Sequence, residues 1–117
     1  MKWFIGLLVL FSTLYSDVTV VASDGDSVTA NVSSKASRCD YYIFVDQNGK
    51  VIEVIENGHK EVRGGASSAL VSMLKEREAT HFIAASFGDK LVNALKSNNI
   101  KYTASTGSVE KAIETLK

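Results

Sequence analysis

Three short glycine-bearing stretches constrain the fold of this 117-residue chain more than any other feature. They are residues 63–67 (RGGAS), 85–88 (ASFG) and 105–108 (STGS), and each precedes a segment whose apolar residues recur at helical spacing. The second and third stretches also directly follow a strand-like run. If the strands between them are parallel, the three loops and three helix N-termini meet at one edge of a sheet. Such an edge favours anions, because unpaired backbone N–H groups and helix dipoles point towards it.

The order of the strand-like and helix-like segments predicts the topology. Strand-like runs cover residues 18–22, 41–46, 50–56, 81–85 and 100–104, and helical spacing begins at Ala66, Leu91 and Val109. Asn48 and Gly49 between the second and third runs predict an antiparallel hairpin. Right-handed crossovers then make the first, fourth and fifth strands parallel. We therefore expect an α/β, ribonuclease H-like three-layer fold with three helices and a five-stranded mixed sheet of order 3-2-1-4-5.

A long polar loop, residues 23–40, falls at the same edge as the glycine stretches in this topology. It exceeds the roughly 12–15 residues usual for a connection without secondary structure of its own. Long loops at the switch point of an α/β sheet are where ligands usually bind. We therefore expect a binding edge built from this loop, residues 57–65, residues 86–88 and residues 105–108.

The N-terminus is typical of a secretory signal peptide. Lys2 precedes an apolar run over residues 3–11, and the small residue Ser16 follows. The run is far shorter than the roughly 20 apolar residues that span a bilayer, although an uncleaved anchor is the alternative. The prediction is a signal peptide over residues 1–16, an exported (periplasmic or secreted) domain over residues 17–117, and no stable membrane insertion after cleavage.

Charge and reactive side chains argue against nucleic-acid binding and against catalysis. The whole chain has 13 basic and 13 acidic residues, and no basic stripe that would bind nucleic acid. Hydrolysis by metal ions needs converging carboxylates, but Asp24 and Asp26 lie at the opposite end of the predicted sheet from Asp46. With two histidines, no nucleophile–histidine–acid set can be placed either. We therefore expect the protein not to be an enzyme.

Six segments carry a resemblance to a known family. They are residues 20–25 (VVASDG), 42–46 (YIFVD), 54–59 (VIENGH), 64–66 (GGA), 87–88 (FG) and 106–113 (TGSVEKAI). Their order and spacing resemble the dinitrogenase iron–molybdenum cofactor biosynthesis family, the NifX-like domains, from Val18 to Leu116. The resemblance implies a ribonuclease H-like fold. It also implies a protein that carries or inserts iron–sulfur-type metalloclusters without catalysing turnover.

One stretch departs from the family pattern. The family usually has Ser-x-His-Phe-Gly-Arg before the second strand, and its histidine is implicated in cluster binding. This chain has residues 33–39 (SSKASRC) there, with Lys35 at the position of the histidine. A protonated lysine cannot ligate iron, but it can pair with an anionic cluster.

Two residues are candidate metal ligands. Cys39 is the only soft ligand, and Arg38 would lower the pKa of its thiol if the two side chains approach. His59 is a candidate imidazole ligand at the same edge. The alternatives are a packed cysteine and a solvated turn histidine. Two protein ligands are too few for a structural zinc site.

The remaining candidates would form an anion cradle. Its members are Lys35, Arg38, Gly64, Gly65, Gly88 and Gly107. The basic side chains would supply charge, and the glycines would let backbone N–H groups approach the ligand. The predicted function is an exported, non-enzymatic carrier of an iron–sulfur or iron–molybdenum type cluster. The alternative is a family member that has lost cluster binding and serves as a protein-interaction or small-anion-binding module.

Overall fold

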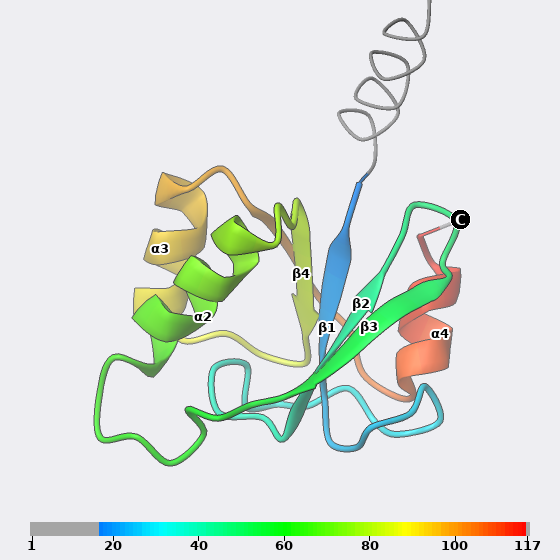
Figure 1. The fold of residues 1–117 in the computed structure, drawn as a ribbon, viewed down its shortest axis with the longest axis horizontal. Helices are drawn as coiled ribbons and strands as arrows, with labels where there is room; N and C mark the ends of the chain where they lie inside the picture. The colour runs from blue at the N-terminus through cyan, green and yellow to red at the C-terminus, as the bar shows by residue number, and fades with distance from the viewer. Residues whose placement is uncertain (1–16, 117) are drawn as a thin grey trace, which may run out of the picture.

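The computed structural model describes residues 17–116, so the predicted signal peptide lies outside the described residues. The elements are β1 (Thr19–Ser23), β2 (Tyr41–Val45), β3 (Val51–Glu56), α2 (Ala66–Glu76), β4 (His81–Ala84), α3 (Asp89–Ser97), β5 (Lys101–Ala104) and α4 (Val109–Glu114). The strands form one sheet of order β3-β2-β1-β4-β5 (Figure 1). No helix among the described residues is long and apolar enough to cross a membrane.

The sheet is mixed, as predicted. β1 pairs with β2 in antiparallel fashion and with β4 in parallel fashion, and β5 continues the parallel part. The carboxyl ends of β1, β4 and β5 therefore lie at one edge. The predicted strand order and the three helices are confirmed. Each of the five strands lies within one residue of its predicted bounds at either end. The strands position the loops that form the site.

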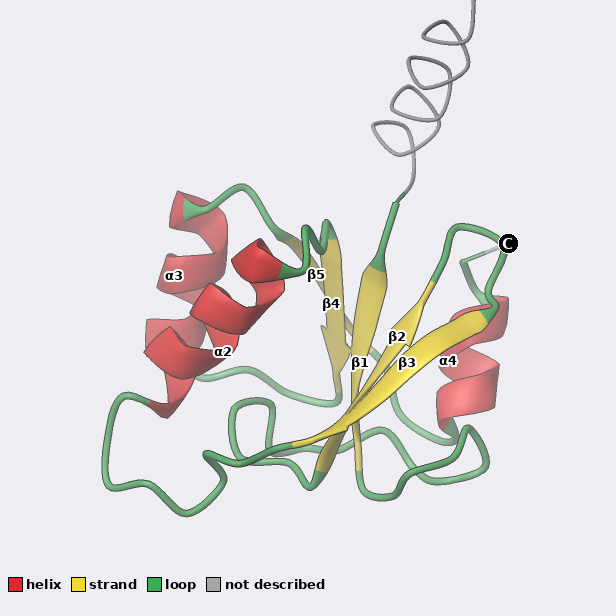
Figure 2. Cartoon of the chain, viewed as in Figure 1, coloured by secondary structure: helices red, strands yellow, loops and turns green. Residues whose placement is uncertain are grey.

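Helices cover both faces of the sheet, which gives three layers (Figure 2). The α2 and α3 face is filled by Val20, Tyr42, Phe44, Leu74, Phe82 and Leu95, and the α4 face by Val21, Ile43, Ile83, Val109 and Ile113. Val20 and Val21 enter opposite cores because successive strand side chains point to opposite faces. All five residues of β1 are buried, as a central strand covered on both faces requires.

The hairpin between β2 and β3 forms, but its turn differs in detail from the expectation. Gly49 adopts a positive φ of 84°, whereas Asn48 does not. The Asp46 carboxylate instead accepts hydrogen bonds from the backbone N–H groups of Asn48 and Lys50, each at 2.9 Å. An acidic side chain therefore organises this turn, and only the glycine needs left-handed backbone.

The long loop after β1 is held firmly across the sheet edge. Val32 forms a short antiparallel bridge with Ser23, and Asn31 forms one with Ser108. The Ser33 N–H donates to the Ala22 carbonyl, and the Ser33 carbonyl accepts from Ala85 N–H, both at 2.8 Å. The middle of the loop thus joins the carboxyl ends of β1 and β4, which fixes the residues that follow it.

His81, at the opposite edge of the sheet, makes stability depend on pH. Its half-buried ring lies 2.7 Å from Thr103 Oγ1, and burial together with Lys101 lowers its pKa below the ordinary 6.5. The unfolded chain then binds more protons as pH falls below about 6.5, so the free energy of unfolding should decrease there. Urea titrations at pH 7.5 and 5.5 should show this decrease in the wild type and in His59→Gln. His81→Gln should show less of it, and an unchanged decrease in His81→Gln would contradict this assignment.

Candidate functional site

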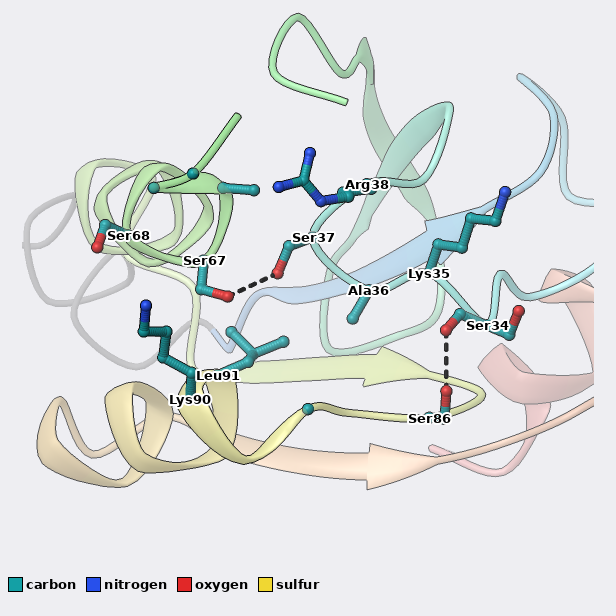
Figure 3. A pocket seen from close by; sticks show the side chains of 14 residues that line it. Ser34, Lys35, Ala36, Ser37, Arg38, Ser67, Ser68, Ser86, Lys90 and Leu91 are labelled. Atoms are coloured by element: carbon teal, nitrogen blue, oxygen red, sulfur yellow. Dashed lines mark hydrogen bonds between the residues drawn. The ribbon is translucent and has the colours of Figure 1, made fainter. Parts of the chain in front are cut away.

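A cleft of about 400 Å³ opens at the edge where β1 and β4 end (Figure 3). It lies between the N-terminus of α2, the N-terminus of α3 and the loop over residues 34–38. Its lining includes Lys35, Arg38, Gly64, Gly65, Gly88 and Lys90, together with Ser34, Ser37, Ser67, Ser68 and Ser86. Five of the residues proposed from the sequence as an anion cradle therefore meet in one place.

Both long helices present open N-termini to this cleft. Gly65 precedes α2 with φ 75° and ψ 8°, and Gly88 precedes α3; neither helix has a side-chain cap. Within the described part of the chain, the N–H groups of residues 66–68 and 89–91 have no hydrogen-bond acceptor. Unpaired N–H groups and the helix dipoles give each end a partial positive charge. Two such ends facing one cleft favour an anion.

The third glycine stretch is not part of this cleft. The Val109 and Glu110 N–H groups at the start of α4 donate to the carbonyls of Ala30 and Val28, each at 2.8 Å. Ser108 caps the helix by accepting from Lys111 N–H at 3.1 Å. Because α4 packs on the other face of the sheet, Gly107 lies away from Gly64, Gly65 and Gly88. The protein itself closes this helix end.

Three basic residues, Lys35, Arg38 and Lys90, line the cleft. The Arg38 guanidinium donates to the carbonyls of Lys60 (3.3 Å) and Val62 (2.5 Å), so it also joins two loops. Lys35 is exposed and extends away from Lys90 in Figure 3. Lys90 is exposed in the first turn of α3 and was missed in the sequence analysis. The feature of the sequence that could have identified Lys90 is its position two residues after Gly88.

Serine contacts hold the cleft loop against its neighbours. The hydroxyls of Ser37 and Ser67 lie 3.2 Å apart, which joins the loop to α2. The Ser86 hydroxyl donates to the Ser34 carbonyl at 2.8 Å, which joins it to the segment between β4 and α3 (Figure 3). The cleft is therefore bounded by three segments that are tied to one another.

Cys39 lies beneath the loop and is buried, at 2 % exposure. Its thiol donates to the Tyr41 carbonyl at 3.2 Å, and burial raises its pKa from 9.0 to about 11. The Arg38 side chain, expected to lower this pKa, instead reaches the backbone of Lys60 and Val62. The thiol form is therefore favoured at neutral pH, and the thiolate that would ligate a metal is disfavoured.

His59 is exposed and lies in a separate groove of about 160 Å³ between β3 and α2. Cys39 borders a different hollow, of about 280 Å³, beside Asp24 and Asp40. The two predicted ligands thus line different hollows. Within residues 17–116, no group of three or more histidine, cysteine, aspartate or glutamate side chains is placed to hold a metal ion.

Burial of Cys39 predicts slow reaction with thiol reagents. A pKa near 11 in place of 9.0 lowers the thiolate population at pH 8 by about 100-fold, and the buried sulfur is also shielded from reagent. Labelling of the folded protein by a disulfide reagent should therefore be at least about 100-fold slower than labelling in urea. Comparable rates in the two conditions would contradict the buried thiol.

Fold and site together define a class of protein: a small α/β domain with a cleft, lined by basic residues and two helix N-termini, at the carboxyl edge of its parallel strands. Comparison with known families makes this specific. The family described as dinitrogenase iron–molybdenum cofactor matches residues 17–117. The chain belongs to this family, as the resemblance in its sequence predicted.

Solved structures show the same fold. The apo form of the orange protein from Desulfovibrio gigas is 21 % identical, with a TM-score of 0.77 and 84 % of each chain covered. A putative NifB protein from Thermotoga is 25 % identical, with a TM-score of 0.71 and 85 % of each chain covered. Among curated proteins, none matches the chain. The fold of this chain is therefore shared with other solved structures.

Proposed function

We propose that this protein is an exported, non-enzymatic carrier that holds an anionic metallocluster of iron–sulfur or iron–molybdenum type as cargo. The observation that supports this most is the pair of open helix N-termini that face one cleft with Lys90, Arg38 and Lys35 around it. Backbone N–H groups and basic side chains together are a common way to bind anions. Membership in the cofactor family supports a cluster as the anion.

The chemistry of the cleft suits an anion held by charge and hydrogen bonds. The cleft is lined by ammonium, guanidinium, hydroxyl and N–H donors, and these bind the outer atoms of a cluster without ligating its metals. Cys39 and His59 stay predictions for metal ligation, because they line separate hollows and burial raises the pKa of the Cys39 thiol. We therefore assign cargo binding to the cradle first.

A carrier role, rather than catalysis, fits the placement of the acidic side chains. Asp24 borders the hollow beside Cys39, whereas Asp46 lies near His81 at the opposite edge of the sheet. Metal-dependent hydrolysis needs carboxylates within about 4 Å of shared ions. The name ribonuclease H-like, which we propose for this three-layer arrangement, therefore refers to topology alone.

The second candidate function is a small-anion-binding or interaction module that has lost the cluster. The absence of a three-residue metal group within residues 17–116 favours it, as does lysine at position 35. It uses the same cleft but a simpler cargo, such as an oxyanion. The two candidates differ in whether the isolated protein contains iron and sulfide.

The direct test is the composition of the protein as isolated from its native compartment without oxygen. Iron, molybdenum, copper and acid-labile sulfide would be measured per chain, with the N-terminal residue determined by mass spectrometry. The carrier proposal expects stoichiometric metal and sulfide, and a chain that begins at Asp17 in the exported fraction. Absence of metal and sulfide, even after anaerobic reconstitution, would overturn it in favour of the oxyanion module. A chain that retains Met1 would overturn cleavage.

A further inference from the structure

Asn57, the residue after β3, is a buried polar residue at the groove between β3 and α2, at 6 % exposure. Its amide nitrogen donates to the carbonyls of Ser37 (3.1 Å) and Cys39 (2.9 Å) and lies 3.4 Å from the Tyr42 hydroxyl. Its amide oxygen accepts from His59 N–H at 2.9 Å. One side chain therefore bonds two segments that are about 20 residues apart in sequence.

Tyr42 completes the same network. Its hydroxyl donates to the Ala36 carbonyl at 2.9 Å, and its buried ring packs near Phe82. Asn57 and Tyr42 thus hold the carbonyl oxygens of residues 36, 37 and 39 on the inner side of the loop. Neither Asn57 nor Tyr42 lines the cleft, so these carbonyl oxygens bond to groups outside it.

Besides the Arg38 bonds to Lys60 and Val62, an Asn57 backbone bond and an ion pair join the same two segments. The Asn57 N–H donates to the Asp40 carbonyl at 2.9 Å. Lys60 pairs with the Asp40 carboxylate at 2.8 Å and, by that hydrogen bond and charge, lowers the pKa of Asp40. Both of these groups are exposed, so the ion pair contributes little. The Asn57 amide is thus the buried side-chain contact between these two segments.

We propose that Asn57 is a positioning residue for the cargo, through its hold on the loop that carries Lys35 and Arg38. It keeps carbonyl oxygens out of an anion site and sets the spacing between this loop and the segment that leads to Gly64 and Gly65. Asn57 does not itself line the cleft. This inference rests on the proposed function for its effect on binding, but its effect on the loop stands independently.

Asn57→Asp is the sharpest test, because it removes the N–H donors of the side chain and keeps its acceptor oxygen. The carboxylate still accepts from His59 N–H, but it cannot donate to the carbonyls of Ser37 and Cys39 and instead repels them. We expect molybdate, used as a tetrahedral dianion probe, to bind at least tenfold more weakly at pH 8. Protonation at lower pH restores one O–H donor, so the loss should shrink towards pH 6.

Asn98→Asp is the matched control, since Asn98 donates its amide to the Ala94 carbonyl at the far end of α3. It should keep molybdate affinity within twofold of the wild type. Amide hydrogen exchange at residues 34–38 should accelerate in Asn57→Asp and not in Asn98→Asp, with or without molybdate. If Asn57→Asp fails to fold, Tyr42→Phe should show the same faster exchange and severalfold weaker binding.

The outcomes separate the two proposals. A wild type that binds neither molybdate nor a reconstituted cluster overturns the proposed function. The amide hydrogen exchange rates at residues 34–38 would still test whether Asn57 holds the loop. Equal molybdate affinity and equal exchange in Asn57→Asp and Asn98→Asp overturn the positioning role. Faster exchange at residues 34–38 with weaker binding that recovers towards pH 6 supports it.

Discussion

Replacement of Lys90 by glutamine should weaken molybdate binding by up to about fivefold, the range for loss of one exposed charge pair, because glutamine keeps an N–H donor but not the charge. Lys90 lies in the first turn of α3, is exposed, and lines the cleft beside the open helix end. Its removal takes one of the three basic side chains from the site without disturbing the core. Isothermal titration at low salt is the measurement, because salt screens exposed charges.

Lys96→Gln is the control for this prediction. Lys96 lies on the same helix, in its last turn and away from the cleft. The same change of charge there should leave molybdate affinity within about twofold of the wild type. Equal losses in the two variants would show that net charge, rather than the cleft, governs binding.

Replacement of Phe82 by alanine should lower the free energy of unfolding by about 3–5 kcal/mol, the usual cost of removing a buried aromatic ring. Phe82 lies on β4 with 0 % exposure, and its ring centroid is 6.2 Å from that of Tyr42 and 6.0 Å from that of Phe87. The cavity would open between the sheet and the α2–α3 layer. Urea denaturation at pH 7.5 measures the change.

Phe82→Leu is the matched variant, because it keeps most of the apolar volume. Phe82→Leu should lose less than about 1.5 kcal/mol of its free energy of unfolding.

Because the Tyr42 hydroxyl holds the cleft loop at Ala36, Phe82→Ala should also weaken molybdate binding. A loss of stability below about 1 kcal/mol in Phe82→Ala would contradict tight packing of this ring in the core.

The sequence allowed the fold to be predicted because its signals are local. The strand order follows from three local signals and the rule of right-handed crossovers. The signals are the mostly apolar run of β1, the Asn48–Gly49 turn, and helical spacing after each glycine stretch. The same topology places Gly64, Gly65 and Gly88 at one edge. Right-handed crossovers and strand direction account for this much of the site.

The rest of the site depends on contacts between distant segments, which the sequence pattern does not reveal. Gly107 was expected in the cleft, but residues 28–30 close the α4 N-terminus on the other face of the sheet. Arg38 would lower the pKa of the Cys39 thiol if the two side chains approached, but its side chain reaches residues 60 and 62 while burial raises the thiol pKa. The sequence pattern shows neither how deeply a side chain is buried nor in which direction it extends.

In the proposed function, charge and backbone N–H groups, rather than Cys39 and His59, hold the cargo. The most direct measurement is the metal and sulfide content per chain of two variants prepared anaerobically beside the wild type. One is Cys39→Ser combined with His59→Gln, and the other is Lys90→Glu. We predict that the double variant keeps its metal and sulfide while Lys90→Glu loses most of both. Loss in the double variant with retention in Lys90→Glu would contradict the claim and make Cys39 and His59 the binding residues.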